Sequence, residues 1–83
     1  MTVTEAIKII QQENPKHKVL ECLEFSTFYA FGLVPPGYDT DQHDAYGGAY
    51  DTVDKATGKV SVFMPTDNLE AYRQAKTIDI RNL

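Results

Sequence analysis

The stretch from residue 50 to residue 63 constrains the fold of this 83-residue chain most strongly. It contains two runs of β-prone residues, Tyr-Asp-Thr-Val-Asp and Val-Ser-Val-Phe, joined by the polar loop Lys-Ala-Thr-Gly-Lys. Gly58 in that loop suits the left-handed backbone conformation that a longer hairpin loop requires. The sequence therefore predicts an antiparallel hairpin with strands at about 49–54 and 60–64.

Size and charge restrict the classes of protein to which the chain can belong. A chain of this length forms one domain, and 42% hydrophobic with 24% charged residues is typical of a folded globular protein. The formal net charge is −4, and no cluster of Lys or Arg forms a basic stripe, so nucleic acid is not expected as a partner.

The N-terminal sequence and the single cysteine bear on localisation. Residues 1–6 lack the basic and apolar regions of a secretory signal, and no apolar run approaches the roughly 20 residues of a membrane span. Cys22 is the only cysteine, so an internal disulfide is excluded. We therefore expect a cytoplasmic protein in a reducing compartment, with no membrane partner.

Residues 3–13 are predicted to form an amphipathic helix. Thr2 and Glu5 have the spacing of a capping box, and Asn14-Pro15 ends the helix because the residue before proline avoids helical geometry. The apolar side chains at i, i+3, i+4 and i+7 are Val3, Ala6, Ile7 and Ile10.

Residues 18–34 are predicted to form two antiparallel strands, at about 18–25 and 28–34, joined at Ser26-Thr27. Both faces of the second strand carry apolar side chains, with Tyr29, Phe31 and Leu33 on one face and Phe28, Ala30 and Val34 on the other. One face is expected to meet the helix, which leaves the other for a partner.

Towards the C-terminus, Asp67 is predicted to cap a short helix, with Glu70 three residues later. The alternating tail 78–83 fits either a last edge strand or a frayed end. The expected fold is a single α+β domain over residues 1–83. Its N-terminal helix packs on an antiparallel sheet of about four strands, and a short helix lies near the C-terminus.

The acidic connection at about 35–48 is the predicted functional region. Five aspartates and no Lys or Arg lie between Pro35 and Asp54, and tyrosines are interleaved with them. Tyrosines supply contact area, and like charges on a loop steer a basic partner. The predicted contact surface consists of Tyr38, Asp39, Asp41, Asp44, Tyr46 and Tyr50. The alternative is that the tyrosines pack over the sheet edge while the aspartates maintain solubility.

Two kinds of chemistry are not expected from this sequence. A metal site at Asp39, Asp41, His43 and Asp44 lacks the glycine and the closing acid of an EF-hand loop. A cysteine nucleophile would need Cys22 with His17 or His43, the thiol and imidazole groups that the sequence offers. Cys22, however, lies inside a predicted apolar strand, where cysteine behaves as a small hydrophobe. We expect no catalytic residue, metal or cofactor, and hence no enzyme.

The Glu5-Ala6-Ile7 helix start and the turn at 53–60 carry a family resemblance. With them the chain resembles small bacterial proteins of the YrhB-like, immunity protein 35 type, and the turn is also similar to that of PepSY-like domains, which are usually exported or membrane-attached. The first resemblance implies a non-catalytic protein that neutralises a toxin by occlusion. The alternative function is a small homodimeric structural or regulatory protein of phage or mobile-element origin. That dimer would form through the second apolar sheet face, with Phe28, Phe31 or Phe63 buried.

Overall fold

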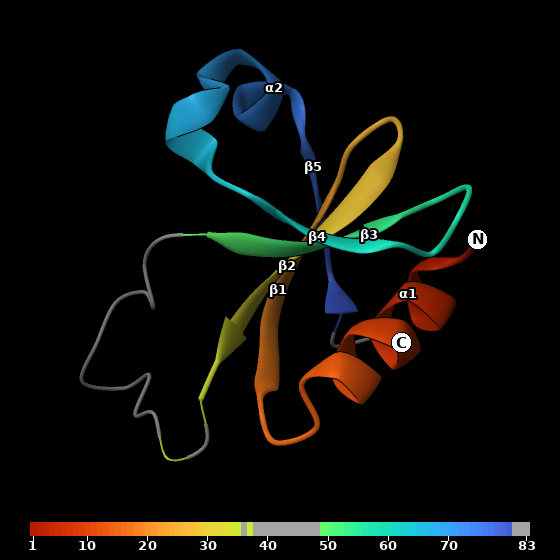
Figure 1. The fold of residues 1–83 in the computed structure, drawn as a ribbon. Coiled ribbons are helices and arrows are strands. Elements are labelled where there is room, and N and C mark those ends of the chain that lie inside the picture. The colour runs from red at the N-terminus through yellow and green to blue at the C-terminus, as the bar shows by residue number, and fades with distance from the viewer. Residues whose placement is uncertain (36, 38–48, 81–83) are drawn as a thin grey trace.

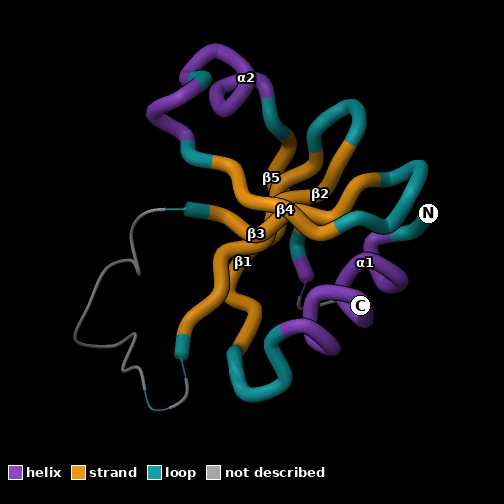
Figure 2. The backbone as a smooth tube through the Cα atoms, viewed as in Figure 1, coloured by secondary structure: helices purple, strands orange, loops and turns teal. Residues whose placement is uncertain are grey.

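A computed structural model of the chain describes residues 1–35, 37 and 49–80 (Figure 1). These residues form an α+β fold in which an antiparallel sheet lies between an N-terminal helix and a short helix near the C-terminus (Figure 2). The elements in chain order are α1 (Val3–Glu13), β1 (Lys18–Glu24), β2 (Phe28–Val34), β3 (Tyr50–Asp54), β4 (Val60–Phe63), the 3-10 turn η1 (Pro65–Asp67), α2 (Leu69–Gln74) and β5 (Lys76–Ile78). The sheet order is β4-β3-β2-β1-β5, so the predicted fold class is confirmed and β5 adds a fifth strand.

Helix α1 occupies the predicted range and begins with the predicted capping box. Thr2 Oγ1 accepts a hydrogen bond from the Glu5 N–H at 3.2 Å, and Glu5 Oε1 accepts one from the Thr2 N–H at 3.1 Å. The helix ends at Asn14, before Pro15. Ala6 and Ile10 are four positions apart, so their side chains lie on the same side of the helix. Both are fully buried, which shows that this side faces the sheet.

Strands β1 and β2 form the predicted hairpin, but their pairing contains an irregularity. The register shifts between Val19 and Glu21, which makes a bulge at Leu20. A bulge changes which face the following side chains meet. As a result Val19 packs with Cys22 on the α1 side of the sheet, although the two are an odd number of positions apart, and Glu21 lies on the other side.

The β3–β4 hairpin closes around Gly58, which has a φ of 75°. The Gly58 N–H donates to the Asp54 carbonyl at 2.8 Å, and the Asp54 N–H donates to the Lys59 carbonyl at 2.9 Å. This is the bond pattern of a bulge with glycine in the left-handed conformation. Both strands begin and end within one residue of the predicted bounds, so the hairpin and the role of Gly58 are confirmed.

The two faces of the sheet carry separate apolar clusters. The cluster beneath α1 contains Ala6, Ile10, Cys22, Tyr29, Phe31, Leu33 and Val53. The cluster on the opposite face contains Leu23, Phe25, Ala30 and Tyr50, with Phe28, Phe63, Ala71 and Ala75 packed against it. The Phe25 ring stacks on that of Phe28 at 4.4 Å between centroids and meets that of Phe63 at 5.0 Å. Helix α1 therefore covers the face that carries Phe31, and α2 lies over part of the other face (Figure 1).

Helix α2 corrects one prediction. Its N-cap is Asn68, whose side chain accepts a hydrogen bond from the Ala71 N–H at 3.1 Å, and not Asp67. Asp67 is excluded from that position because it is the last residue of η1, where its N–H donates to the Met64 carbonyl. The helix then leads into β5, which pairs with the second half of β1, while residues 81–83 of the predicted tail lie outside the described residues.

Candidate functional site

Most of the predicted contact surface lies outside the described residues. This holds for Tyr38, Asp39, Asp41, Asp44 and Tyr46. The structure does fix the two points between which they lie, because β2 ends at Val34 and β3 begins at Tyr50. These strands are antiparallel neighbours, so the acidic connection starts and finishes at one end of the sheet. We call this end, at Val34 and Tyr50, the acidic end.

Tyr50 is the one predicted contact residue that the structure describes. Its ring is buried on the α2 side of the sheet, with 9% of the residue exposed. Its hydroxyl donates to Glu21 Oε1 at 2.7 Å and lies 3.4 Å from the Tyr72 hydroxyl. Burial, followed by the hydrogen bonds with Tyr72 and Glu21, raises the pKa of the Tyr50 hydroxyl. Tyr50 thus connects β3 to β1 and α2, and its contact with a partner stays a prediction.

Gly32 makes room for the Tyr50 hydrogen bond. Glu21 is paired with Gly32 across the β1–β2 ladder. A Cβ atom at position 32 would lie 2.8 Å from the Glu21 Cγ atom, closer than such contacts occur. Because glycine lacks this atom, the Glu21 side chain has space beside β2 as it reaches Tyr50 on β3.

The two described aspartates of the acidic region, Asp51 and Asp54, differ in environment. Asp54 accepts hydrogen bonds from the N–H groups of Thr57 and Ala56, and these bonds lower the pKa of its carboxyl. Asp51 is half-buried, and burial raises the pKa of its carboxyl while His17 opposes the shift. Asp54 therefore stabilises its own hairpin loop.

Cys22 has the surroundings of a structural cysteine. It is fully buried within the cluster beneath α1. Burial, with smaller contributions from Glu24 and Glu21, raises the pKa of its thiol to about 12, so the thiolate is disfavoured at neutral pH. The sequence prediction that Cys22 behaves as a small hydrophobe is in accord with this placement.

The described residues contain no group of three or more His, Cys, Asp or Glu side chains that could hold a metal ion. The metal hypothesis concerned Asp39, Asp41, His43 and Asp44, which lie outside the described residues.

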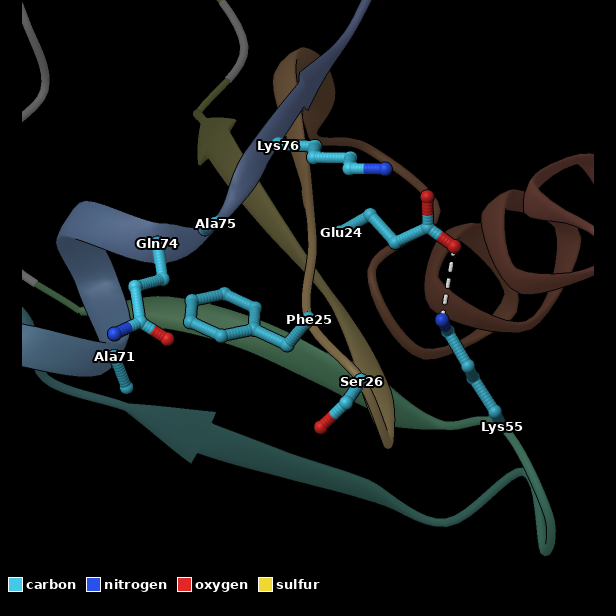
Figure 3. Close-up of a pocket in the computed structure, with 8 residues that line it drawn as sticks. All are labelled: Glu24, Phe25, Ser26, Lys55, Ala71, Gln74, Ala75 and Lys76. Atoms are coloured by element: carbon cyan, nitrogen blue, oxygen red, sulfur yellow. Dashed lines mark hydrogen bonds and ion pairs between the residues drawn. The ribbon is translucent and has the colours of Figure 1, made fainter.

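A groove of about 400 Å³ lies at the opposite end of the sheet from the acidic connection (Figure 3). The β1–β2 turn, the start of the β3–β4 loop and the α2–β5 junction surround it. Its lining consists of Glu24, Phe25, Ser26, Lys55, Ala71, Gln74, Ala75 and Lys76. The Phe25 ring, Ala71 and Ala75 form an apolar surface, and charged groups lie along one margin (Figure 3).

An ion pair joins two walls of this groove. Lys55 Nζ lies 2.8 Å from Glu24 Oε2 and 4.8 Å from the centroid of the Tyr29 ring. The hydrogen bond from Lys55 lowers the pKa of the Glu24 carboxyl, and the charges of Lys55 and Lys76 add to this effect. Because Glu24 is held ionised by Lys55, it is poorly suited to act as a general acid.

Sequence reasoning did not bring Glu24 and Lys55 together. The ion pair joins residues 31 positions apart, so no local pattern points to it. Strand parity contains the relevant signal, since Cys22 and Glu24 share a face of β1, and Val53 and Lys55 share a face of the β3 segment. That signal becomes usable only when the strand order is known.

Three comparisons with known proteins complete the description of the site. No family model matches the chain, and no curated protein or solved structure matches it either. Among the residues that the structure describes, no helix is long and apolar enough to cross a membrane.

Proposed function

We propose that this protein is a non-catalytic protein-binding module, an immunity-type inhibitor that neutralises a toxin by occlusion. Its contact surface is the acidic connection with Tyr38, Asp39, Asp41, Asp44 and Tyr46, and Tyr50 stands at the base of this surface. The partner is a protein with a basic surface. The class of partner comes from the resemblance to immunity protein 35, and the surface comes from the residues of this chain.

The observation that carries the proposal is the way in which the acidic connection is attached to the sheet. Val34 and Tyr50, on either side of it, are both buried, and Tyr50 is also hydrogen-bonded to Glu21. A segment with fixed ends loses less conformational entropy on binding than a free tail does. Three aspartates within six positions, without an intervening Lys or Arg, attract a basic partner over distances comparable to the Debye length.

The environment of the other ionisable groups supports a binding role over a catalytic one. Cys22 is buried with a raised thiol pKa, and Glu24 is paired with Lys55. Neither group has the exposure and the pKa that a nucleophile or a general acid requires. Cys22 and Glu24 thus have structural surroundings.

The alternative dimer through the second apolar face is less well supported. Phe31, one of its three proposed contact residues, is fully buried beneath α1. Phe28 and Phe63 do lie on the other face, but they pack against Phe25 next to α2. The part of that face available for a flat dimer contact is therefore reduced.

The proposal is tested by capturing the partner from the native host on immobilised protein. The key variant carries Asp39→Lys, Asp41→Lys and Asp44→Lys. The control carries Glu13→Lys, Asp67→Lys and Glu70→Lys, which change the net charge equally at exposed positions outside the acidic connection. Far-ultraviolet circular dichroism confirms that both variants are folded.

We expect the wild-type chain and the control to retain the same protein, and the variant of the acidic connection to lose it. Co-expression then tests whether the captured protein is a toxin, because the wild-type chain restores growth of cells that produce it. Equal capture by both triple variants would contradict the assigned surface, and a captured protein that is harmless to cells would contradict the immunity function.

A further inference from the structure

Within the part of the chain that the structure describes, strand β4 is a free edge of the sheet. It lies at one margin in the order β4-β3-β2-β1-β5. Val60–Phe63 contains no charged residue and no proline, and Val62 is 61% exposed. The opposite edge, β5, is only three residues long and begins with Lys76. Lysine or proline within an edge strand prevents edge-to-edge pairing, and β4 contains neither.

The backbone groups that β4 leaves free can be identified from its pairing with β3. The Asp54 N–H donates to the Lys59 carbonyl, so positions 54 and 59 bond directly across the hairpin. In an antiparallel ladder such directly bonded pairs alternate with non-bonded ones. Lys59, Ser61 and Phe63 therefore bond towards β3, while the N–H and C=O groups of Val60 and Val62 and the N–H of Met64 point away from the sheet. The Met64 carbonyl already accepts the Asp67 N–H at 3.0 Å and has one further lone pair for a partner strand.

The available stretch of this edge is symmetric about Val62. Pro65 follows Met64 and has no N–H, so it closes the stretch on one side. The hairpin loop, with Lys59 as its last residue, closes it on the other side. Between these limits the outward-pointing residues are Val60, Val62 and Met64, with Val62 at the centre. An antiparallel copy of the same strand would bond Val62 to Val62, and Val60 to Met64 at both ends.

Side chains and charges suit the same arrangement. The side chains of Val60, Val62 and Met64 alternate with those of Ser61 and Phe63, so they point to the same face of the strand. The pairing therefore places these apolar side chains from both copies next to one another on one face of the sheet. Val62 and Met64 are among the exposed large hydrophobic residues of the described chain. Lys59 precedes the strand and Asp67 follows it, and antiparallel pairing brings each end of one copy towards the oppositely charged end of the other.

We propose that two copies of this chain associate through β4 by antiparallel edge pairing centred on Val62. The product is one continuous sheet of ten strands, five from each copy, with both α1 helices on the same face. The surface differs from the aromatic face considered above and is independent of the acidic connection. A single pair of short strands buries less than the roughly 1,200 Å² of a stable interface, so the dimer is weak and forms at high protein concentration.

Analytical ultracentrifugation over a wide concentration range tests the association. The test variant is Val62→Lys, which places two ammonium groups together at the centre of the dimer. The matched control is Leu20→Lys, an exposed apolar position on β1 with the same change in charge. We expect wild-type and Leu20→Lys chains to dimerise alike, and Val62→Lys to remain monomeric with unchanged circular dichroism.

Amide hydrogen exchange reports the register directly. In the dimer, the amides of Val60, Val62 and Met64 gain protection as concentration rises, while those of Ser61 and Phe63 are protected at all concentrations. A wild-type chain that stays monomeric throughout would overturn the proposal. A dimer that Val62→Lys leaves intact would overturn it as well. So would a dimer in which no outward amide of β4 gains protection, because its copies would then associate through another face.

Discussion

The two faces of the sheet are covered by helices, but the two helices do so differently. Helix α1 contributes Ala6 and Ile10, both fully buried, to a cluster that also encloses Cys22, Phe31 and Val53. Helix α2 contributes no buried residue, and its Leu69 and Tyr72 are exposed. The chain itself therefore covers the α1 face, whereas residues 1–35, 37 and 49–80 cover the α2 face only in part.

Because of this difference, the α1 face supplies most of the stability, and the α2 face has more exposed positions for contacts. Apolar burial stabilises in proportion to the area removed from water, so the α1 face contributes most of the stability. The α2 face carries the Tyr50 and Glu21 hydrogen bond beside the acidic end. A small domain has a narrow margin of stability, and concentrating its core on one face leaves the other free for contacts.

Shortening a side chain beneath α1 is the strongest test of this comparison. Ile10→Ala removes part of a fully buried side chain and leaves a cavity, so we expect a loss of about 2–5 kcal/mol in the free energy of unfolding. Leu69→Ala, at a position that is 51% exposed on α2, should change it by less than about 0.5 kcal/mol. Urea denaturation measures both, and equal losses would contradict the assignment of the core to the α1 face.

The Tyr50 hydroxyl gives the next largest expected effect, on the α2 face. Tyr50→Phe removes the donor to Glu21 and should lower the free energy of unfolding by about 1 kcal/mol. Combining it with Glu21→Ala, which removes the acceptor, in a double-mutant cycle isolates the interaction. Tyr72→Phe serves as the comparison, because its hydroxyl lies 3.4 Å away, and it should cost less. Additive losses in the cycle would show that this bond does not connect β1 to β3 energetically.

The N-cap of α2 offers a smaller effect. Asn68→Ala removes the side-chain acceptor for the Ala71 N–H, and we expect a loss of about 0.5–1 kcal/mol. Asp67→Ala is the neighbouring control and should be close to neutral, since no side-chain cap of α2 depends on it. Urea denaturation of the two variants distinguishes the observed cap from the predicted one, and a greater loss at Asp67 would restore the original assignment.

The Glu24 and Lys55 ion pair should give the smallest effect. Both side chains are partly exposed, so Lys55→Met should cost less than about 0.5 kcal/mol and lose its effect at high salt. Lys55 holds the pKa of Glu24 below its usual value of 4.5. The contribution is therefore present above pH 4.5 and lost as the pH falls through the lower pKa of the folded state. Thermal unfolding of Lys55→Met and wild type from pH 7 downwards, in low and high salt, measures it.

Local signals in the sequence predicted α1, the β1–β2 hairpin and the β3–β4 hairpin nearly to the residue. The capping box at Thr2 and Glu5 and the left-handed glycine at Gly58 act over a few residues, so they can be recognised without knowledge of the fold. The strand parity of Phe31 likewise identified which side chains share a face of β2, although not which face α1 covers.

What the sequence could not supply depends on long-range pairing. The cap of α2 is Asn68 because η1 extends to Asp67, and the placement of β5 beside β1 follows from the return of the chain over the α2 face. The hydrogen bond between Glu21 and Tyr50 joins residues 29 positions apart and depends on the bulge at Leu20. The site was predicted from the charge of its aspartates and from its interleaved tyrosines, and of its residues only Tyr50 lies among those the structure describes.

The most direct test of the central claim is the association rate of the captured partner with the wild-type chain and with the two triple-charge variants, measured by stopped flow at increasing ionic strength. Electrostatic steering by the acidic connection predicts a wild-type rate that falls steeply with salt. It also predicts a slow, nearly salt-independent rate for Asp39→Lys with Asp41→Lys and Asp44→Lys, and a wild-type slope for the control. If the variant of the acidic connection binds as fast as the control, with the same dependence on salt, the account is contradicted.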